Sequence, residues 1–300
     1  GKAEDCPWPL PVHDLLLGLN WVVEQIDSFG GDPRRLTVAG QSAGGWYAHL
    51  LSLLPETVNK IQGVALLSMG TRTPWSADYQ AQVMARAYEI EPDLLTVSAE
   101  QVLRVGFQAL TKNPVQLGYA PSAFLPVASQ AIPEPFLDPH WAAEQSHARK
   151  FYIRYTAEES ASFFFDLPEY LQVNQDQVDE ALGQWQVEDL PACLLYKGQF
   201  VGADSGLSPY QQLVAASSWR QFQRFPVLYA SALRQRHKQV KLTRFELSSP
   251  LSALGSGHCF DLPFQFGMRQ AWHDAPMLEG LDNDTFERES FRLRRELYDF

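Results

Sequence analysis

The sequence predicts an α/β protein in which a mostly parallel sheet is flanked by helices. Two observations support this prediction: short β-prone runs alternate with longer helical stretches along the 300-residue chain, and a glycine-rich turn joins the first of these runs to a helix. Strands that are separated by helices are typical of parallel sheets, because a parallel neighbour needs a crossover connection. No internal repeat, low-complexity tract or clear linker divides the chain, so we expect a single domain over residues 1–300.

The first elements follow from apolar spacing and from turn residues. Residues 14–29 carry apolar side chains at spacings of three and four, with Asp14 available as the N-cap, which predicts an amphipathic helix. Gly30-Gly31-Asp32-Pro33 should end this helix, because proline cannot continue it. Residues 36–39 are β-prone and predict a strand, and residues 46–54 predict the helix that follows the glycine-rich turn. The apolar stripe of the first helix consists of Leu15, Leu19, Val22, Val23, Ile26 and Phe29.

The alternation of strands and helices continues along the chain. Further strands are expected at three apolar or alternating runs, residues 64–67, 151–155 and 240–247. Helices are expected at residues 78–89, at residues 98–110 and over much of residues 167–237. The last of these regions should form a helical cap or a flanking region.

Composition excludes several classes of function. The chain carries 24 basic and 35 acidic side chains, a net charge of −11, and its Lys and Arg residues form no dense block in the sequence. Nucleic acid and an anionic membrane are therefore not expected as partners. No stretch reaches the ~20 apolar residues that a membrane-spanning helix needs. Neither a metal site nor a disulfide framework is predicted, because Cys6, Cys193 and Cys259 lack metal-ligand spacing and are odd in number.

The main chemical signal is Gly40-Gln41-Ser42-Ala43-Gly44, a Gly-x-Ser-x-Gly sequence between a predicted strand and a predicted helix. This context is typical of a nucleophile elbow, in which the serine sits on a sharp turn and the glycines on both sides avoid a collision between strand and helix. The helix after Ser42 points N–H groups at the place where an oxyanion would form, and one donor should be the amide of Ala43. The alternative interpretation is a plain strand-to-helix turn of small residues.

A serine nucleophile needs a histidine base and a carboxylate that orients the base. Of the seven histidines, His258 lies in a Gly-Ser-Gly-His loop after the last predicted strand, where the base belongs in hydrolases with the order Ser, acid, His. The acid should follow the strand at residues 151–155, where Glu158 and Glu159 are adjacent. Only one of two adjacent side chains on a turn can reach the imidazole, and periodicity does not say which. A solvated acidic turn and a surface loop are the alternatives here.

These motifs, taken in order, resemble those of type-B carboxylesterases, the cholinesterase-like and para-nitrobenzyl-esterase-like branch of the α/β-hydrolase superfamily. Leu19-Asn20-Trp21-Val22 and Phe29-Gly30-Gly31-Asp32-Pro33 resemble the helix and turn before the family's nucleophile. Gly40 to Gly44 resembles its elbow, with Gln41 where Glu is commoner. Further similar segments are Phe124-Leu-Pro-Val, Thr156 to Ser160, Thr243-Arg244-Phe245, Gly255 to His258 and Asp261-Leu-Pro-Phe-Gln-Phe-Gly267.

The resemblance implies an α/β-hydrolase fold and an assignment of the acid. In the family's T-x-D-E-G turn the second acidic residue belongs to the triad, which implies Glu159, although Glu158 and Ser160 replace the usual Asp and Gly. Family members are usually longer, so the chain is expected to lack N-terminal strands and a His-Gly-Gly-Gly-type loop that donates oxyanion-hole amides. Without those strands, the strand at residues 36–39 would have an unpaired edge.

We expect a serine carboxylic-ester hydrolase that acts through an acyl-enzyme. Ser42 attacks the ester, His258 moves the proton and Glu159 orients His258, with the amide of Ala43 in the oxyanion hole. No metal or organic cofactor is needed, and the expected partner is a small-molecule ester. Two alternatives remain from the sequence: a non-catalytic cholinesterase-like interaction module, and an inactive fragment that needs a missing N-terminal segment.

Other residues receive simpler interpretations. Phe163-Phe164-Phe165 follows the proposed acid, and a helix packed into the core is preferred over a substrate pocket. His49 is expected to serve packing or solvation, and Cys259 is assigned no role. The lack of a leader sequence and of a disulfide pattern favours the cytoplasm. The natural ester, its acyl length and the oligomeric state are not indicated by the sequence.

Overall fold

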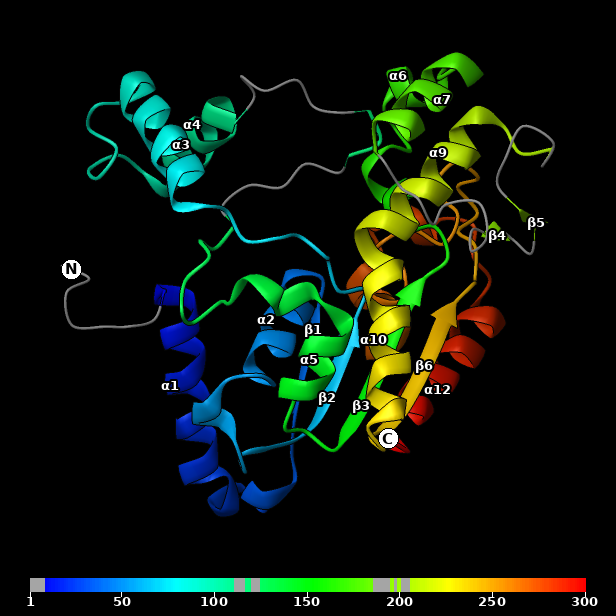
Figure 1. Cartoon of the computed structure of the whole chain (residues 1–300). Helices are drawn as coiled ribbons and strands as arrows, with labels where there is room; N and C mark the ends of the chain where they lie inside the picture. The colour runs from blue at the N-terminus through cyan, green and yellow to red at the C-terminus, as the bar shows by residue number, and fades with distance from the viewer. Residues whose placement is uncertain (1–8, 111–116, 120–124, 186–194, 197–198, 201–205) are drawn as a thin grey trace.

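A four-stranded parallel sheet forms the centre of the molecule in the computed structural model, which describes residues 9–110, 117–119, 125–185, 195–196, 199–200 and 206–300. Its strands lie in the order β1-β2-β3-β6, with the bounds Leu36–Gln41, Ile61–Leu67, Lys150–Thr156 and Gln239–Phe245. All three pairings are parallel, so the carboxyl ends of the strands meet at the upper edge of the sheet in Figure 1. The four predicted strands and the α/β class are thus confirmed, with strand ends that differ by up to three residues.

Helices cover both faces of this sheet. One face carries α2 (Ala43–Leu51), α5 (Pro139–Gln145) and α10 (Arg224–Gln235), and the end of α12 (Asn283–Tyr298) packs on the other (Figure 1). The other helices are α1 (Leu10–Gln25), α3 (Ala77–Ile90), α4 (Ala99–Leu110), α6 (Pro168–Leu171), α7 (Gln175–Gln184), α9 (Pro209–Ser218) and α11 (Leu262–Phe266). A short antiparallel ribbon consists of β4 (Leu195–Tyr196) and β5 (Gln199–Phe200).

The inner strands are buried on both faces, as expected for a parallel sheet between helices. Val64 and Leu66 of β2 belong to the apolar core beneath α2, α5 and α10, whereas Ala65 and Leu67 pack against the end of α12. This alternation follows from the two-residue period of a strand. β1 lies at the edge of the sheet, and among the described residues no strand pairs with its outer edge. β1 is accordingly partly exposed along its length.

The first helix differs from its prediction at both ends. It begins at Leu10 after Pro9, so Asp14 lies inside α1 and is not its N-cap. A proline at the second helical position presets the helical backbone there, which explains the earlier start. The helix ends at Gln25 and a 3-10 turn carries Phe29 out into solvent, where its side chain is 75% exposed. Gly30, with a φ of 81°, ends this turn.

Of the predicted helical regions after β2, α3, α4, α6, α7 and α9 lie above the carboxyl ends of the strands in Figure 1, whereas α10 runs along the face of the sheet. α3 and α4 pack on each other as a pair, which confirms the helices expected at residues 78–89 and 98–110. Farther along, α6, α7, α9 and α10 occupy most of the described part of residues 167–237. α9 and α10 are joined by one π-helical turn, Trp219–Gln223, and such turns are frequent at functional sites.

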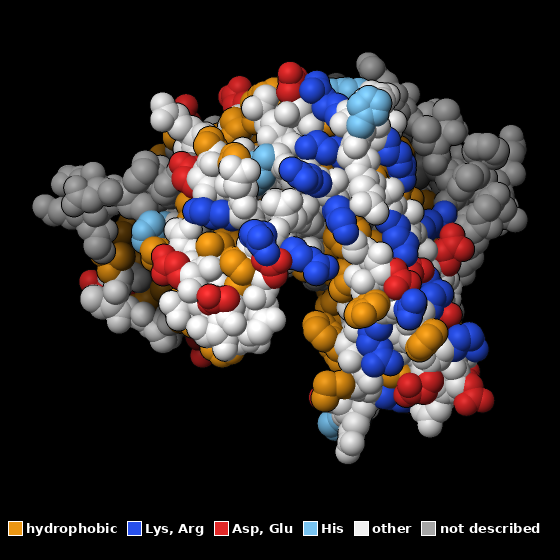
Figure 2. All heavy atoms as spheres, turned by 90° about the horizontal axis from the view of Figure 1, so that it is seen from below, with side chains coloured by type: hydrophobic (Ala, Val, Ile, Leu, Met, Phe, Trp, Pro, Cys, Tyr) orange, Lys and Arg blue, Asp and Glu red, His pale blue; other side chains and the backbone are white. Residues whose placement is uncertain are grey.

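The opposite end of the sheet, where the strands begin, is rich in cations. Figure 2 shows Lys and Arg side chains gathered on this underside. Arg149 and Lys150 lie at the start of β3, and Lys238 directly precedes β6. The charges of Arg149 and Arg236 add to burial in lowering the pKa of Lys238, so these cations are close in space. Residues that form no block in the sequence are therefore brought together by the fold, at the end remote from Ser42.

Candidate active site

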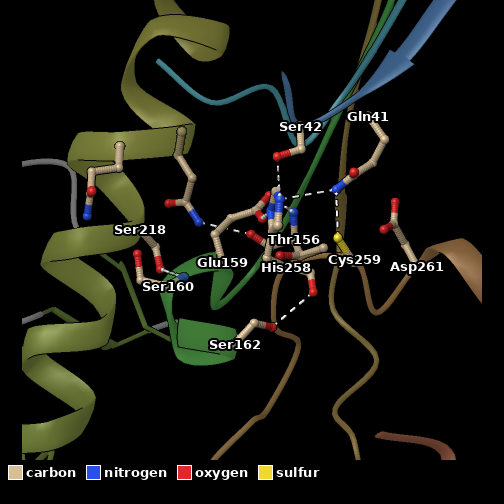
Figure 3. Close-up of polar contacts among 12 residues, drawn as sticks. Gln41, Ser42, Thr156, Glu159, Ser160, Ser162, Ser218, His258, Cys259 and Asp261 are labelled. Carbon is tan, nitrogen blue, oxygen red and sulfur yellow. Dashed lines mark hydrogen bonds and ion pairs between the residues drawn. The ribbon is translucent and has the colours of Figure 1, made fainter. Parts of the chain in front are cut away.

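Three predicted site residues meet at the carboxyl edge of the sheet (Figure 3). His258 Nε2 lies 2.8 Å from Ser42 Oγ, and His258 Nδ1 lies 2.6 Å from Glu159 Oε2. Ser42 follows β1, Glu159 follows β3 and His258 lies in the loop after β6, so three of the four strands are followed by one of these residues and β2 is not. Glu159 is fully buried and His258 is 7% exposed. This arrangement has the connectivity of a nucleophile, a base and an orienting acid.

Ser42 occupies the sharp turn that the sequence predicts. Its backbone has φ 58° and ψ −119°, a strained combination for a residue with a side chain. Gly40 is required by close approach, because a Cβ there would lie 2.1 Å from the carbonyl group of Gly44. The prediction that Gly44 also avoids a collision is wrong, because a Cβ on Gly44 would meet nothing within 4 Å. The second tight contact is at Gly45, where a Cβ would lie 3.1 Å from the Gly40 oxygen.

The two adjacent glutamates point to different partners. Glu159 accepts hydrogen bonds through both oxygens, from the Thr156 amide at 2.7 Å and from the imidazole. Glu158 instead accepts a hydrogen bond from the amide of Ser256, in the loop that carries His258. The geometry therefore brings Glu159 to His258, and Glu158 ties the histidine loop to the turn after β3.

The imidazole of His258 is enclosed by aromatic rings. Its centroid lies 5.5 Å from the ring of Phe163 and 4.8 Å from that of Phe222. The helix predicted at residues 163–165 is wrong, because Phe163 ends a 3-10 turn, Glu159–Phe163, and residues 164–165 form a turn. Burial in the core is confirmed for Phe164. Burial disfavours the charged ring, but hydrogen bonds to Cys259 and Glu159 and the charge of Glu159 outweigh it and raise the pKa of His258.

Gln41 and Cys259 form a contact that sequence reasoning missed. The Gln41 side-chain nitrogen donates to Cys259 Sγ at 3.0 Å and lies 3.2 Å from His258 Nε2 (Figure 3). Each residue adjoins a triad member in the sequence, which is the only signal that could have indicated this contact. Gln41 therefore sits at the same imidazole nitrogen as the nucleophile.

The π-helical turn also supports the acid from a distance. Gln223, at the end of this turn, donates through Nε2 to the carbonyl oxygens of Thr156 and Ala157, at 2.9 and 3.1 Å. Ser218 Oγ accepts from the amide of Ser160 at 2.9 Å. The turn that carries Glu159 is thus held on both sides by α9 and the turn after it. Sequence reasoning missed this support, because α9 lies about 50 residues later and shows only a helical pattern.

A buried ion pair anchors the histidine loop to β3. Arg154 is 1% exposed and Asp261 is fully buried. Arg154 Nε donates to Asp261 Oδ2 at 2.8 Å, and Nη2 lies at the same distance from that oxygen but outside hydrogen-bond geometry. Arg154 Nη1 also donates to Gln265 Oε1 at 2.8 Å and to the Tyr152 hydroxyl at 3.2 Å. Burial, opposed by Arg154, raises the pKa of Asp261.

The remaining site predictions concern the oxyanion and metals. Ala43 is the first residue of α2, where backbone N–H groups have no partner within the helix, and it is exposed beside Ser42. Phe124 of the predicted Phe-Leu-Pro-Val segment lies outside the described residues, as do Cys6 and Cys193. Within the described part of the chain, no group of three or more His, Cys, Asp or Glu side chains is arranged to hold a metal ion. None of the described helices is both long and apolar enough for a membrane span.

Comparison with known proteins finds similarity to carboxylesterases and related hydrolases. Residues 3–278 match the model of the carboxylesterase family. The chain is 28% identical over 297 residues to the phenmedipham hydrolase of Pseudarthrobacter oxydans, covering 96% of this chain and 57% of that protein. It is 28% identical over 309 residues to the probable N-octanoylanthranilate hydrolase of Rhodococcus erythropolis, covering 95% and 58%.

The solved structure of a thermophilic PNB esterase superposes with a TM-score of 0.68 and 26% identity, over 94% of this chain and 57% of that one. The chain thus spans a little under three fifths of the length of these relatives.

Proposed function

The chain belongs to the carboxylesterase family, and from this premise we propose that it hydrolyses carboxylic esters through an acyl-enzyme on Ser42. One observation carries the proposal: a single imidazole, that of His258, lies within hydrogen-bond reach of both Ser42 and Glu159. The strained backbone of Ser42 supports it, because such strain is characteristic of an exposed nucleophile at a strand-to-helix turn.

Acylation begins when Ser42 Oγ attacks the carbonyl carbon of the ester while His258 Nε2 takes up the hydroxyl proton. The tetrahedral intermediate collapses as the C–O bond to the alcohol breaks, and His258 gives its proton to the departing alcohol oxygen. A water molecule then attacks the acyl carbon and His258 takes up one of its protons. The bond to Ser42 breaks, His258 returns the proton to Oγ, and the carboxylic acid leaves.

Glu159 holds the imidazole ready for both steps. Its hydrogen bond at Nδ1 favours the tautomer with the proton on that nitrogen, which leaves the Nε2 lone pair to face Ser42. Its negative charge also stabilises the imidazolium that forms in each step. Glu159 keeps this role because its other oxygen is held by the Thr156 amide.

The developing oxyanion is stabilised by the amide of Ala43 at the start of α2. Removal of one oxyanion-hole donor costs about 100- to 1,000-fold in turnover in a well-studied serine hydrolase. A site with the Ala43 amide as its sole donor would therefore turn over slowly and still form an acyl-enzyme.

A second candidate is a chain that reacts only after further polypeptide completes its sheet. The observation in its favour is the outer edge of β1, which borders an apolar groove of about 430 Å³ between α1 and α2. Leu15 and Leu19 of α1 and Tyr47 of α2 line this groove. A non-catalytic interaction module has less support, because all three triad residues are present and in contact.

Covalent labelling separates these candidates without a guess about the substrate. The parent chain, treated with a small organophosphonate, is expected to gain the mass of one phosphonyl group, and Ser42→Ala is expected to gain none. Glu159→Gln should label far more slowly, by up to about 10⁴-fold, as in triads that hold the wrong tautomer. Glu158→Gln is the matched control and should label at the parent's rate, because a glutamine can still accept the hydrogen bond of the Ser256 amide.

Hydrolysis of 4-nitrophenyl butyrate by the same variants completes the test. The proposal fails if folded parent protein gains no adduct, or if Ser42→Ala labels as fast as the parent. Labelling that appears only after addition of a longer relative's N-terminal segment favours the second candidate.

A further inference from the structure

A side-chain amide shares one nitrogen of the proposed base with the nucleophile. The side-chain nitrogen of Gln41 lies 3.2 Å from His258 Nε2, and Ser42 Oγ lies 2.8 Å from the same atom (Figure 3). The nitrogen of a side-chain amide can donate hydrogen bonds but cannot accept them. The contact with Gln41 is therefore favourable only while His258 Nε2 carries a lone pair, which means while the ring is neutral.

The tautomer that this contact requires is the one that Glu159 selects. Glu159 Oε2 lies 2.6 Å from His258 Nδ1, and a carboxylate there accepts a proton carried by Nδ1. His258 Nε2 is then the acceptor, with Ser42 and Gln41 as its two donors. The carboxylate and the amide thus favour the same neutral form of the ring. They have opposite effects on the charged form, because Glu159 attracts an imidazolium and a second donor at Nε2 disfavours one.

Gln41 is held in this orientation at both ends. Its backbone ends β1, where it pairs in parallel register with Leu67 of β2. At the other end, the side-chain nitrogen also donates to Cys259 Sγ at 3.0 Å. Both N–H groups of the amide therefore have an acceptor, one a sulfur atom and the other an imidazole nitrogen. A rotation of the amide that exchanged its nitrogen for its oxygen would lose both hydrogen bonds.

The imidazole of His258 faces groups from several elements. Two phenylalanine rings, one from the 3-10 turn and one from the π-helical turn, cover it and carry no charge. The titratable groups beside it are Glu159, on the turn after β3, and Cys259 and Asp261 in its own loop. Asp261 is paired with Arg154. Glu159 is thus a buried negative charge in direct contact with the ring, and it favours a ring that keeps its proton, whereas a general base must be neutral to act.

We propose that Gln41 is a positioning residue whose amide keeps His258 neutral and able to accept a proton, and so offsets the carboxylate on the other side of the ring. This inference rests on the proposed esterase function. Once His258 has taken the proton of Ser42, its Nε2–H group faces an amide nitrogen that cannot accept it. The amide therefore favours the step in which His258 passes this proton to the departing alcohol.

The first test is the pH profile of ester hydrolysis. Gln41→Glu keeps the shape of the side chain and places a carboxylate at Nε2, so the midpoint of the rise in kcat/KM for 4-nitrophenyl butyrate should move up by about 1–3 pH units. Below both midpoints the variant should be about 10- to 1,000-fold slower than the parent, and this loss should shrink as the pH rises. A merely structural defect would lower the rate by the same factor at every pH.

Gln41→Met keeps the length of the side chain and removes both donors without adding a charge. Its midpoint should move up by about 0.5–1 pH unit, the effect of one neutral hydrogen bond. Gln25→Glu is the matched control, because it adds the same charge at an exposed position at the end of α1, and its profile should equal the parent's. Circular dichroism checks that each variant is folded. If Gln41→Glu does not fold, the shift in Gln41→Met decides.

Proton binding measured without turnover separates this inference from the esterase proposal. In Ser42→Ala with ¹³C-labelled histidine rings, NMR gives the titration midpoint of His258, whose signal is identified by its loss in His258→Gln. Adding Gln41→Met should raise this midpoint, and adding Gln41→Glu should raise it further. This order in a chain that hydrolyses no ester would leave the effect of Gln41 on the imidazole standing and remove the proposed function.

Two results overturn the inference. One is a His258 midpoint that stays in place or falls in both Gln41 variants. The other is a loss of rate in Gln41→Glu that is the same at every pH.

Discussion

Asp261→Leu is expected to destabilise the fold by about 3–5 kcal/mol, because it leaves a buried guanidinium without its counter-charge. Arg154 is 1% exposed, so water cannot replace the lost carboxylate. The partners that remain, Gln265 and Tyr152, are both neutral and both bond to Nη1. The Nε atom would lose its acceptor altogether.

Replacement of the other partner, Arg154→Met, should destabilise the fold less than Asp261→Leu does. A carboxyl group can take up a proton when it loses its cation, whereas a guanidinium group cannot give one up. Burial already raises the pKa of Asp261, and the loss of Arg154 removes the main opposing effect. In Arg154→Met the folded state therefore binds a proton at Asp261 more tightly than the unfolded state does, so the stability deficit relative to the parent should shrink as the pH falls from 7 to 5.

Urea denaturation of the two single variants and of the double variant measures the coupling between the two side chains. The double variant, with Met and Leu in place of the ion pair, should lie within about 2 kcal/mol of the parent, since apolar replacement of a whole buried pair is often neutral. Additive effects in the double variant, or an Arg154→Met variant whose deficit relative to the parent grows at low pH, would refute this account of the ion pair.

Gly40→Ala should destabilise the fold by about 3 kcal/mol or more, because its Cβ would collide with the Gly44 carbonyl, whereas Gly44→Ala meets open space and should melt like the parent by circular dichroism. His49 is fully buried, and burial, against one opposing hydrogen bond, lowers its pKa to about 4. The unfolded chain therefore gains a proton first as the pH falls from 7 to 4, and urea melts should show a loss of about 3 kcal/mol that is absent in His49→Gln. Because the pKa of His258 is raised and the base must be neutral to act, kcat/KM for a 4-nitrophenyl ester should increase with pH above the usual histidine pKa. Glu159→Gln should lower the rate and move the midpoint of that rise to lower pH.

Each of these outcomes has a clear opposite. A Gly44→Ala variant as unstable as Gly40→Ala would remove the steric argument. An acid loss that persists unchanged in His49→Gln would assign it to other groups. A midpoint that stays in place in Glu159→Gln would mean that the carboxylate does not set the pKa of the base.

Local patterns predicted much of this protein correctly. The strand, sharp turn and helix around Ser42 are encoded within about a dozen residues. The turn requires Gly40 because a Cβ there would collide with Gly44, and this glycine is visible in the sequence pattern. The candidate base was also recognisable, because His258 lies in a glycine-containing loop directly after a strand. The start of α1 was predicted wrongly, since the effect of an early proline outweighed the capping signal of Asp14.

Other features could not be predicted because they depend on contacts between distant segments. The choice between Glu158 and Glu159 could not be made from periodicity, and it depends on which carboxylate the Thr156 amide and the imidazole reach. The contact of Phe222 with the imidazole needs a π-helical turn, which a 3.6-residue pattern does not reveal. The predicted single domain, the compartment and the absence of a nucleic-acid partner stay predictions.

Ser42 and His258 are 216 residues apart in the sequence, which affects when the site can form during synthesis on the ribosome. When Ser42 leaves the ribosome, His258 has not yet been synthesised, so the serine has no base beside it. The later synthesis of Glu159 does not supply a base. The imidazole joins only after β6 has docked beside β3, which requires most of the chain to have left the exit tunnel. On the proposed mechanism a nascent chain does not react with esters, and the onset of hydrolysis during translation would report when β6 docks beside β3.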